Sequence, residues 1–376
     1  MRDGPRWQTI IDLLDQTLND RVPADLALRR WSKSARFAGS KDRRFIGDTL
    51  FDICRHLGPI RYQLAEAGGD PTSMRQIVMI AACAFIGESA GKGTGEALGA
   101  IFDGSQHAPD SLTEDEQEIL TKALDVLPPP EEALSVPDWA RDGFVASFDG
   151  DPIWKAEATA LLSPAAVDLR LRSPKDNRDD VLKALGARGV DVDATPISPL
   201  GLRISGRFAA GDVPELNDGQ LEIQDEASQL CALLVAAEPK MQVLDLCAGA
   251  GGKTLAMAGQ MAGQGRLLAI DADEHKLGEA AKRVKRAKWP HIDLLHADAL
   301  TVPDDALEGD WDRVLVDAPC SGSGTWRRAP DARWRMDGDD LSRLVELQGK
   351  LLVRAARLVR PGGLLCYVTC SLLSVE

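Results

Sequence analysis

Five short apolar segments in the second half of the chain constrain its fold more than any other feature. They cover residues 243–246, 267–271, 292–295, 314–317 and 364–368. Helical segments lie between most of them, and strands that alternate with helices form a doubly wound parallel sheet. In such a sheet, ligands bind at the carboxyl ends of the strands. The sequence therefore predicts an α/β, Rossmann-like domain over residues 223–376.

Length and patterning predict further domains upstream of this sheet. The chain has 376 residues, which suffices for two or three domains. One helical face is defined by Ile46, Leu50, Ile53 and Leu57. We expect an all-α domain over residues 1–127. Three consecutive prolines at 128–130 predict a stiff linker over residues 128–150.

Residues 151–222 have a different pattern. The apolar residues Val167, Leu169 and Leu171 alternate with polar ones, as in a strand, and a helical stretch follows at 178–188. A second strand is expected near Leu202. This segment is predicted to be a small α+β module, so the whole chain is multi-domain.

Composition excludes several classes of protein. Hydrophobic residues make up 44% of the chain and charged residues 27%, which is typical of a soluble globular protein. No apolar run approaches the roughly 18 residues that a membrane span needs, so we expect no membrane association and a cytoplasmic location. The seven cysteines include no Cys-x-x-Cys pair, which argues against a disulfide framework and against a structural metal site.

The net charge of −14 disfavours a nucleic-acid partner, because phosphate binding depends on clustered Lys and Arg. The local distribution is different. Residues 21–61 hold ten basic and four acidic residues, residues 276–290 six and one, and residues 327–335 four and one. Each segment is predicted either to contact a polyanion or to be a solvated helix face.

A glycine-rich turn follows the first strand of the predicted sheet and begins a helix. Its residues are Cys247, Ala248, Gly249, Ala250, Gly251, Gly252 and Lys253. Such a turn lets a nucleotide-like ligand approach the backbone closely, although an ordinary tight turn has the same pattern. The phosphate-binding loop of an NTPase would require glycine at position 247. Asp271 ends the second strand 19 residues after Gly252, where a carboxylate can bind both ribose hydroxyls.

Acidic residues follow the next two strands as well. Asp298 is placed to accept a hydrogen bond from an adenine amino group, and Asp317 ends the fourth strand at the same edge. Three carboxylates at this edge suit a cationic sulfonium cofactor, S-adenosylmethionine, better than an anionic dinucleotide. Each of them is also a candidate helix N-cap.

Two cysteines lie where this cofactor is expected. Cys320 and Cys370 follow the carboxyl ends of the fourth and fifth strands. Carbon 5 of cytosine becomes reactive toward a methyl donor once a thiolate has added to carbon 6. The addition places charge on ring nitrogen 3, for which Asp317 is the candidate proton donor. The pattern favours cytosine methylation.

Five motifs of the chain resemble those of the Sun (RsmB-type) family of RNA cytosine-carbon-5 methyltransferases, above all its bacterial small-subunit ribosomal RNA members. They lie at residues 224–229, 245–254, 317–331, 348–352 and 369–371. The resemblance implies a class I methyltransferase fold that binds S-adenosylmethionine. The implied binding residues are 247–253, Asp271, Asp298 and Asp317. Cys370 is implied as the nucleophile, Cys320 as the thiol that assists product release and Lys253 as a positioning residue.

The first half of the chain resembles the same family more loosely. Residues 42–57 look like a helix of the NusB-type RNA-binding domain, and the α+β module would match the family's RNA-recognition-like subdomain. Both favour RNA as the partner, and ribosomal over transfer RNA. No protein partner is indicated. Family members continue past the Thr-Cys-Ser motif through two further strands, so we expect the domain to be truncated at its C-terminus.

Two alternatives have less support. A DNA cytosine methyltransferase would use Cys320 as its nucleophile, but only Pro319-Cys320 matches that class. A non-catalytic RNA-binding assembly factor would have lost a motif residue, and Asp317, Cys320 and Cys370 are all present.

A basic and aromatic segment follows Cys320. The residues expected to hold the displaced RNA are Trp326, Arg327, Arg328, Arg333 and Arg335, with Trp334 beside them. They would act through phosphate contacts and stacking. The rival interpretation is a solvated loop with buried tryptophans.

Overall fold

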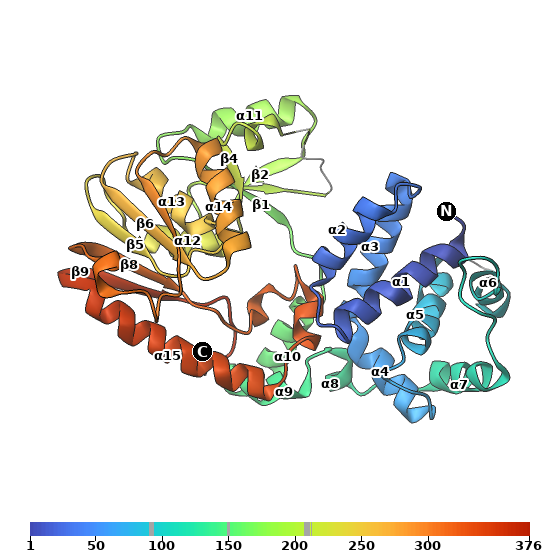
Figure 1. The fold of residues 1–376 in the computed structure, drawn as a ribbon. Helices are drawn as coiled ribbons and strands as arrows, with labels where there is room; N and C mark the ends of the chain where they lie inside the picture. The colour runs from blue at the N-terminus through green and yellow to red at the C-terminus, as the bar shows by residue number, and fades with distance from the viewer. Residues whose placement is uncertain (90–93, 149–150, 207–210, 212) are drawn as a thin grey trace. The chain divides into compact units, whose positions relative to one another are not determined.

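The computed structural model describes residues 1–376 apart from 90–93, 149–150, 207–210 and 212. The chain divides into two compact units, whose elements are drawn in Figure 1. The helical unit comprises residues 1–164, 321–342 and 370–375, and the sheet unit comprises 165–320, 343–369 and 376. The division therefore passes directly after Cys320 and directly before Cys370.

The helical unit is built from helices over its first part, as the sequence predicts. These are α1 (Asp3–Leu18), α2 (Ala24–Ser34), α3 (Ser40–Arg55), α4 (Leu57–Glu66), α5 (Met74–Ser89), α6 (Thr94–Ile101), α7 (Glu114–Asp125), α8 (Pro130–Ala133), α9 (Asp138–Ser147) and α10 (Asp151–Ala160). The predicted face of α3 is confirmed, because Ile46, Leu50 and Ile53 are all buried in the main apolar core.

Residues 128–148 form two helices rather than the stiff linker that the prolines predict, and the last two residues of the predicted linker, 149–150, lie outside the described residues. Pro130 lies in the first turn of α8, where a missing N–H leaves no hydrogen bond unmade. Phe144 of α9 packs with Trp154 of α10 in a second apolar cluster of the helical unit. The helix α10 therefore belongs to this unit, and the sheet unit begins at residue 165 rather than at 151.

Two later segments of the chain complete this second cluster. Trp326 enters it from residues 321–342, and Leu373 enters it from residues 370–375. At Gly143 of α9 an added Cβ would lie 3.0 Å from Leu373 Cδ2, so the glycine makes room for this side chain.

The sheet unit begins with a small antiparallel sheet in the order β2-β3-β1-β4. Its elements are β1 (Val167–Leu171), α11 (Arg178–Ala187), β2 (Val192–Ala194), β3 (Gly201–Ile204), the 3-10 turn η2 (Pro214–Leu216) and β4 (Leu221–Ile223). The predicted strands and helix are thus confirmed. The polar face of β1 is nevertheless interior, since Asp168 and Arg170 are each 1% exposed. Asp168 is compensated by Arg203 at 2.7 Å and by the Glu226 N–H at 3.0 Å.

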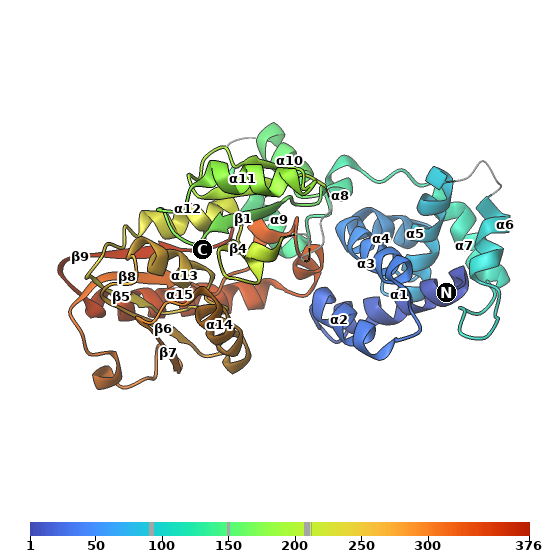
Figure 2. The same ribbon diagram turned by 90° about the horizontal axis from the view of Figure 1, so that it is seen from above.

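A five-stranded parallel sheet in the order β7-β6-β5-β8-β9 follows. Its elements are α12 (Glu226–Leu234), β5 (Gln242–Asp245), α13 (Gly252–Gln260), β6 (Arg266–Asp271), α14 (Glu274–Ala287), β7 (Ile292–His296), η3 (Asp304–Leu307), β8 (Trp311–Asp317), α15 (Gly338–Leu358) and β9 (Val359–Val368). Val243 and Met257 pack in one layer, and Leu244 and Leu351 in the other. Helix α13 thus covers one face and α15 the opposite face, with the strands between them in Figure 1. Figure 2 looks onto the sheet, where β9, β8, β5, β6 and β7 follow one another. The doubly wound sheet is confirmed.

One property of the helices bears on membranes. Within the described ranges, no helix is long and apolar enough to cross a lipid bilayer.

Candidate active site

The glycine-rich turn connects β5 to α13. Gly249 has φ +54° and Gly251 has φ +79°, backbone conformations that glycine adopts without strain. At Gly251 an added Cβ would lie 3.1 Å from Ala280 Cβ, so the turn packs closely on α14. At Gly249 an added Cβ would meet nothing within 4 Å. The turn is therefore supported on one side and open to a ligand at Gly249.

Asp271 at the end of β6 holds this turn. Its Oδ2 accepts the Gly249 N–H at 2.7 Å, and its Oδ1 accepts the Asp273 N–H at 2.8 Å. Each carboxylate oxygen can accept a second hydrogen bond. The arrangement orients Asp271 beside the open space at Gly249, where the sequence predicts that it binds ribose hydroxyls.

Lys253 and Asp317 form an ion pair at the same edge of the sheet. Lys253 Nζ lies 2.7 Å from Asp317 Oδ2, and the two side chains are 13% and 32% exposed. Lys253 is in the first turn of α13 and Asp317 is the last residue of β8. The structure thus brings together two residues that the sequence assigned to one site.

Beneath the turn lies a buried carboxyl, that of Asp245. It is fully buried and accepts the Thr254 hydroxyl at 2.7 Å through Oδ2, while Oδ1 has no partner among the described residues. Burial raises the pKa of Asp245 to about 7. Sequence reasoning gave this residue no role, although it begins the quoted loop motif.

Negative charge converges on this turn. Burial raises the pKa of the Cys247 thiol to about 12, and the carboxylates that raise it further belong to Asp245, Asp271, Asp317 and Asp298. A thiol with such a pKa stays protonated at neutral pH, so Cys247 is a neutral wall residue of the turn. The carboxylates produce the negative potential that a cationic ligand requires.

Asp298 lies at the surface directly after β7. Its Oδ1 accepts the Leu300 N–H at 2.9 Å, and the residue is exposed. This bond makes Asp298 the start of a local turn, and no helix begins here, so Asp298 is not the helix N-cap that was the alternative interpretation. Binding of an adenine amino group by Asp298 stays a prediction.

The residues of the turn fit S-adenosylmethionine. The converging carboxylates match its sulfonium charge, Asp271 offers acceptors for hydroxyls, and the unpartnered Asp245 Oδ1 leaves one acceptor unused. The open face of Gly249 admits a ligand to the backbone. Among the described residues, no group of three or more His, Cys, Asp or Glu side chains is arranged to hold a metal ion.

Strands β8 and β9 end side by side at this edge, each shortly before one of the two cysteines. Asp317 is in register with Val368, and the Ala318 N–H donates to Val368 O at 2.9 Å. Cys320 follows this pair by two residues on one strand, and Cys370 follows it by two on the other. Cys320 is partly buried and Cys370 is exposed.

Within the helical unit, hydroxyl groups connect the segments that follow the two cysteines. Ser371 Oγ lies 3.2 Å from both Ser321 Oγ and Ser323 Oγ, and the Leu372 N–H donates to Ser323 Oγ at 2.7 Å. The Gly324 N–H donates to Cys370 O at 2.9 Å, and a Cβ at Gly324 would lie 2.8 Å from that oxygen. Glycine is therefore required for this close approach to the Cys370 backbone.

The segment expected to contact RNA is mostly interior. Trp326 and Arg333 are fully buried, and their stacked pair is 4.7 Å from guanidinium carbon to ring centroid. Arg333 donates to Ser135 O at 2.9 Å. These two residues have no surface for RNA in this structure, so their predicted contacts are corrected to a structural role. The buried tryptophan matches the rival interpretation.

The remaining arginines of this segment differ in exposure. Arg335 pairs with the buried Asp331 at 2.9 Å. Arg327 is exposed and donates to Pro164 O at 2.9 Å, and Arg328 is exposed. Contacts of these three residues with RNA stay predictions.

Sequence reasoning missed two residues that support the site. Arg283 Nη1 donates to Ala250 O at 2.8 Å and its guanidinium pairs with Glu222 at 2.9 Å, which fixes the turn from α14. Gln348 is 4% exposed, and its Nε2 donates to Pro319 O at 2.9 Å. The signals were present, because Arg283 lies in the basic segment 276–290 and Gln348 begins a quoted motif.

Comparison with known proteins identifies the family. The model of the 16S rRNA methyltransferase RsmB/F family matches residues 232–376. A probable ribosomal RNA small subunit methyltransferase B from Synechocystis is 30% identical over 360 residues, which cover 89% of this chain and 79% of that protein. The chain belongs to the RsmB/F methyltransferase family.

Two further similarities were found. The crystal structure of PH0851 matches 99% of this chain and 87% of that one, with a TM-score of 0.78 and 27% identity. A ribosomal RNA small subunit methyltransferase B from Cronobacter sakazakii is 31% identical over 240 residues, which are 64% of this chain. The chain spans about half the length of this and several similar RsmB/F relatives, with 55%, 49% and 52% of them covered.

Proposed function

We propose that this RsmB/F family member methylates carbon 5 of a cytosine in RNA with S-adenosylmethionine as the methyl donor, and that the RNA is small-subunit ribosomal RNA. The observation that carries the proposal is the register of Asp317 with Val368, because it ends two neighbouring strands together just before the two cysteines. The names of the relatives support the choice of ribosomal RNA. A cytoplasmic location follows from that substrate.

The cofactor would be held by the loop and the carboxylates already described. Residues 247–253 would line it, Asp271 would accept from ribose hydroxyls and Asp298 from adenine. Asp317 would contribute charge near the reacting centre. When bound, S-adenosylmethionine supplies an electrophilic methyl group.

Cys370 is the proposed nucleophile. Its thiolate adds to carbon 6 of cytosine, the carbon 5–carbon 6 π electrons become available at carbon 5, and carbon 5 gains the methyl group. Removal of the carbon-5 proton then re-forms the double bond and expels the Cys370 thiolate. Cys320 is proposed to assist this release step.

Asp317 and Lys253 are proposed to manage the proton at ring nitrogen 3. The Lys253 ammonium, 2.7 Å from Asp317 Oδ2, would pass a proton to this carboxylate, and Asp317 would donate it to ring nitrogen 3 as the thiolate adds. The proton would return by the same route when the thiolate leaves. Lys253 therefore acts through Asp317 and is a positioning residue.

The first part of the helical unit is proposed to be a NusB-like RNA-binding domain, over residues 1–127. Its corner between α2 and α3 supports this, because Phe37 is 74% exposed and exposed basic residues surround it in sequence. They are Arg30, Lys33, Arg36 and Lys41. An exposed aromatic ring among cations suits stacking on unpaired bases and contact with phosphates. The small antiparallel sheet is proposed to be an RNA-recognition-like subdomain.

Bisulfite sequencing of ribosomal RNA tests the proposal. Cells that express the full-length protein should contain one small-subunit cytosine that resists conversion, and deletion of the gene should remove it. Cys370→Ala in the same cells should match the deletion. A ribosomal RNA methylation pattern that is identical with and without the gene would contradict the proposal.

A further inference from the structure

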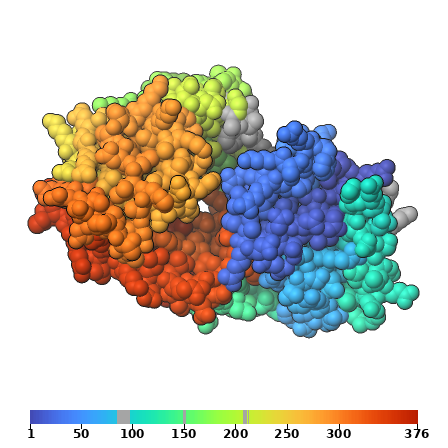
Figure 3. All heavy atoms as spheres, in the orientation of Figure 1, coloured from blue at the N-terminus to red at the C-terminus, as the bar shows by residue number. Residues whose placement is uncertain are grey.

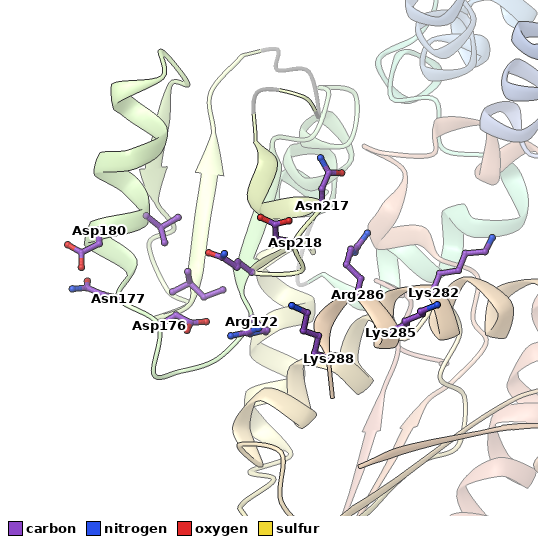
Figure 4. Close-up of a pocket in the computed structure, with 13 residues that line it drawn as sticks. Arg172, Asp176, Asn177, Asp180, Asn217, Asp218, Lys282, Lys285, Arg286 and Lys288 are labelled. Carbon is purple, nitrogen blue, oxygen red and sulfur yellow. The ribbon is translucent and has the colours of Figure 1, made fainter. Parts of the chain in front are cut away.

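A cavity of about 860 Å³ lies within the sheet unit, between the small antiparallel subdomain and α14. One wall is formed by Lys282, Lys285, Arg286 and Lys288 at the end of α14, and Figure 4 shows these residues along this helix, across from the subdomain. The other wall is formed by Asp176, Asn177 and Asp180 around the start of α11. Arg172, Asn217 and Asp218 lie between the two walls.

We infer that this cavity binds the phosphate backbone of the substrate RNA, at a site separate from the cofactor turn. The inference rests on the proposed function for the identity of the polyanion. The local charge differs from that of the whole chain, which carries −14. Because the net charge of the chain is negative, RNA binding depends on local basic clusters such as this wall.

The basic wall is accessible and partly unpaired. Lys282, Lys285 and Lys288 are exposed, and the segment that includes α14 lies on the surface in the space-filling view of Figure 3. Lys282 pairs with Glu279 at 2.7 Å. Within the described residues neither Lys285 nor Lys288 has a carboxylate partner. The C-terminus of a helix favours nearby cations. Lys285 and Lys288, at the end of α14, therefore also stabilise this helix.

Buried donors that lack an acceptor point more directly to an anionic ligand. Arg172 Nε and Arg286 Nε are both buried, and neither has a hydrogen-bond partner among the described residues. The Arg286 guanidinium pairs with Glu222 through Nη2 at 2.6 Å, so the unsatisfied atom of this residue is its Nε. The Arg172 guanidinium is held over the Trp289 ring, 5.6 Å from its centroid, which fixes it at the cavity. An unsatisfied buried donor is destabilising, and a phosphate oxygen would satisfy it.

A close backbone contact joins the two sides of the cavity. At Gly219, which precedes β4, an added Cβ would lie 2.7 Å from Arg286 O and 2.9 Å from Ala287 Cα. The subdomain therefore contacts the backbone of α14 directly, and this contact fixes the distance between the two walls. The carboxylates of Asp176 and Asp180 repel phosphate, so the backbone of a bound strand would follow the lysine wall and its bases would face the amide and carboxylate groups.

The test compares two double variants in RNA binding. Lys285→Gln with Lys288→Gln removes two cavity charges, and Lys183→Gln with Lys240→Gln removes two exposed lysines outside the cavity. Affinity for a single-stranded RNA is measured by fluorescence anisotropy across a salt series. We expect the cavity variant to bind about tenfold more weakly and its salt slope to fall by about 1.4, since each phosphate contact contributes about 0.7. The control should keep wild-type values.

Two results would overturn the inference. One is equal RNA affinity and salt slope for the cavity and control variants. The other is full displacement of RNA by micromolar cytidine monophosphate, which would make the cavity a mononucleotide site. Binding of S-adenosylmethionine and the melting temperature, measured on both variants, should be unchanged. Methyl transfer by the wild-type protein is assayed separately, so a failure of the proposed reaction leaves the binding result interpretable, and a failure of the cavity leaves the reaction standing.

Discussion

Lys253 Nζ and Asp317 Oδ2 are 2.7 Å apart, and this ion pair joins the helix that follows the cofactor turn to the strand that precedes Cys320. The two residues are 64 positions apart in sequence. Substitution of either one separates the proposed proton donor from its partner and leaves Gly249, Gly251 and Gly252 of the turn in place.

Lys253→Met should lower methyl transfer about a hundredfold or more, the range of a lost proton-transfer step. Affinity for S-adenosylmethionine should change less, because Lys253 acts on Asp317. Turnover at saturating cofactor and calorimetric cofactor binding separate the two effects. Lys253→Arg keeps the charge and should recover part of the rate. A Met variant with the wild-type rate would remove Lys253 from the mechanism.

Asp245 should make stability depend on pH. Its carboxyl has a pKa of about 7 when folded against 3.8 as its ordinary value, so the folded protein retains a proton that the unfolded chain loses. The stabilising contribution is therefore full below about pH 4 and is lost as the pH rises to about 7. In the wild-type protein the free energy of unfolding should decrease by about 2 kcal/mol between about pH 5 and about pH 8. Asp245→Asn, which keeps an acceptor for Thr254, should abolish this decrease.

Urea unfolding at both pH values measures this difference. The same decrease in wild type and variant would mean that another group is responsible.

Gln348→Leu should slow product release, because the Nε2 that holds Pro319 O at 2.9 Å is lost next to Cys320. We expect turnover to fall about tenfold. Covalent protein–RNA complex should accumulate relative to wild type, and cofactor affinity should be retained. If turnover falls with no extra complex, the effect of Gln348 is on folding alone, which a thermal melt would also reveal.

Arg333 and Arg328 should differ in what they affect. Arg333→Ala removes a fully buried side chain with its bond to Ser135 O, and should destabilise the protein by about 2 to 4 kcal/mol in urea unfolding. Arg328 is exposed, so Arg328→Ala should change the free energy of unfolding by less than about 0.5 kcal/mol. If the two substitutions have equal effects on stability, the packing of this segment differs from the structure.

Local patterns predicted the sheet and the cofactor turn well. The five apolar segments correspond to β5 to β9, because a central parallel strand is buried on both faces and needs no distant partner to be recognised. Asp271 and Lys253 could also be predicted from the sequence, because each lies at a fixed place relative to the end of a strand. The prolines at 128–130 led to the wrong prediction of a linker, because proline begins a helix as readily as it ends one.

Long-range packing accounts for what the sequence did not predict. Trp326 and Arg333 have the composition of an RNA-binding loop, yet both are buried with residues of α9 and α10 nearly two hundred positions away. The hydroxyl network around Ser371 likewise joins segments 48 and 50 positions apart. No local pattern distinguishes an arginine that binds RNA from one that satisfies a distant carbonyl.

The covalent step through Cys370 is the central claim, and a denaturing gel of full-length protein mixed with labelled ribosomal RNA and S-adenosylmethionine tests it most directly. Cys320→Ala should retain labelled RNA on the protein band, because the adduct forms and release stalls, whereas Cys370→Ala should retain none and should yield no 5-methylcytidine. Labelled RNA retained by Cys370→Ala, or normal methylation by that variant, would contradict the account.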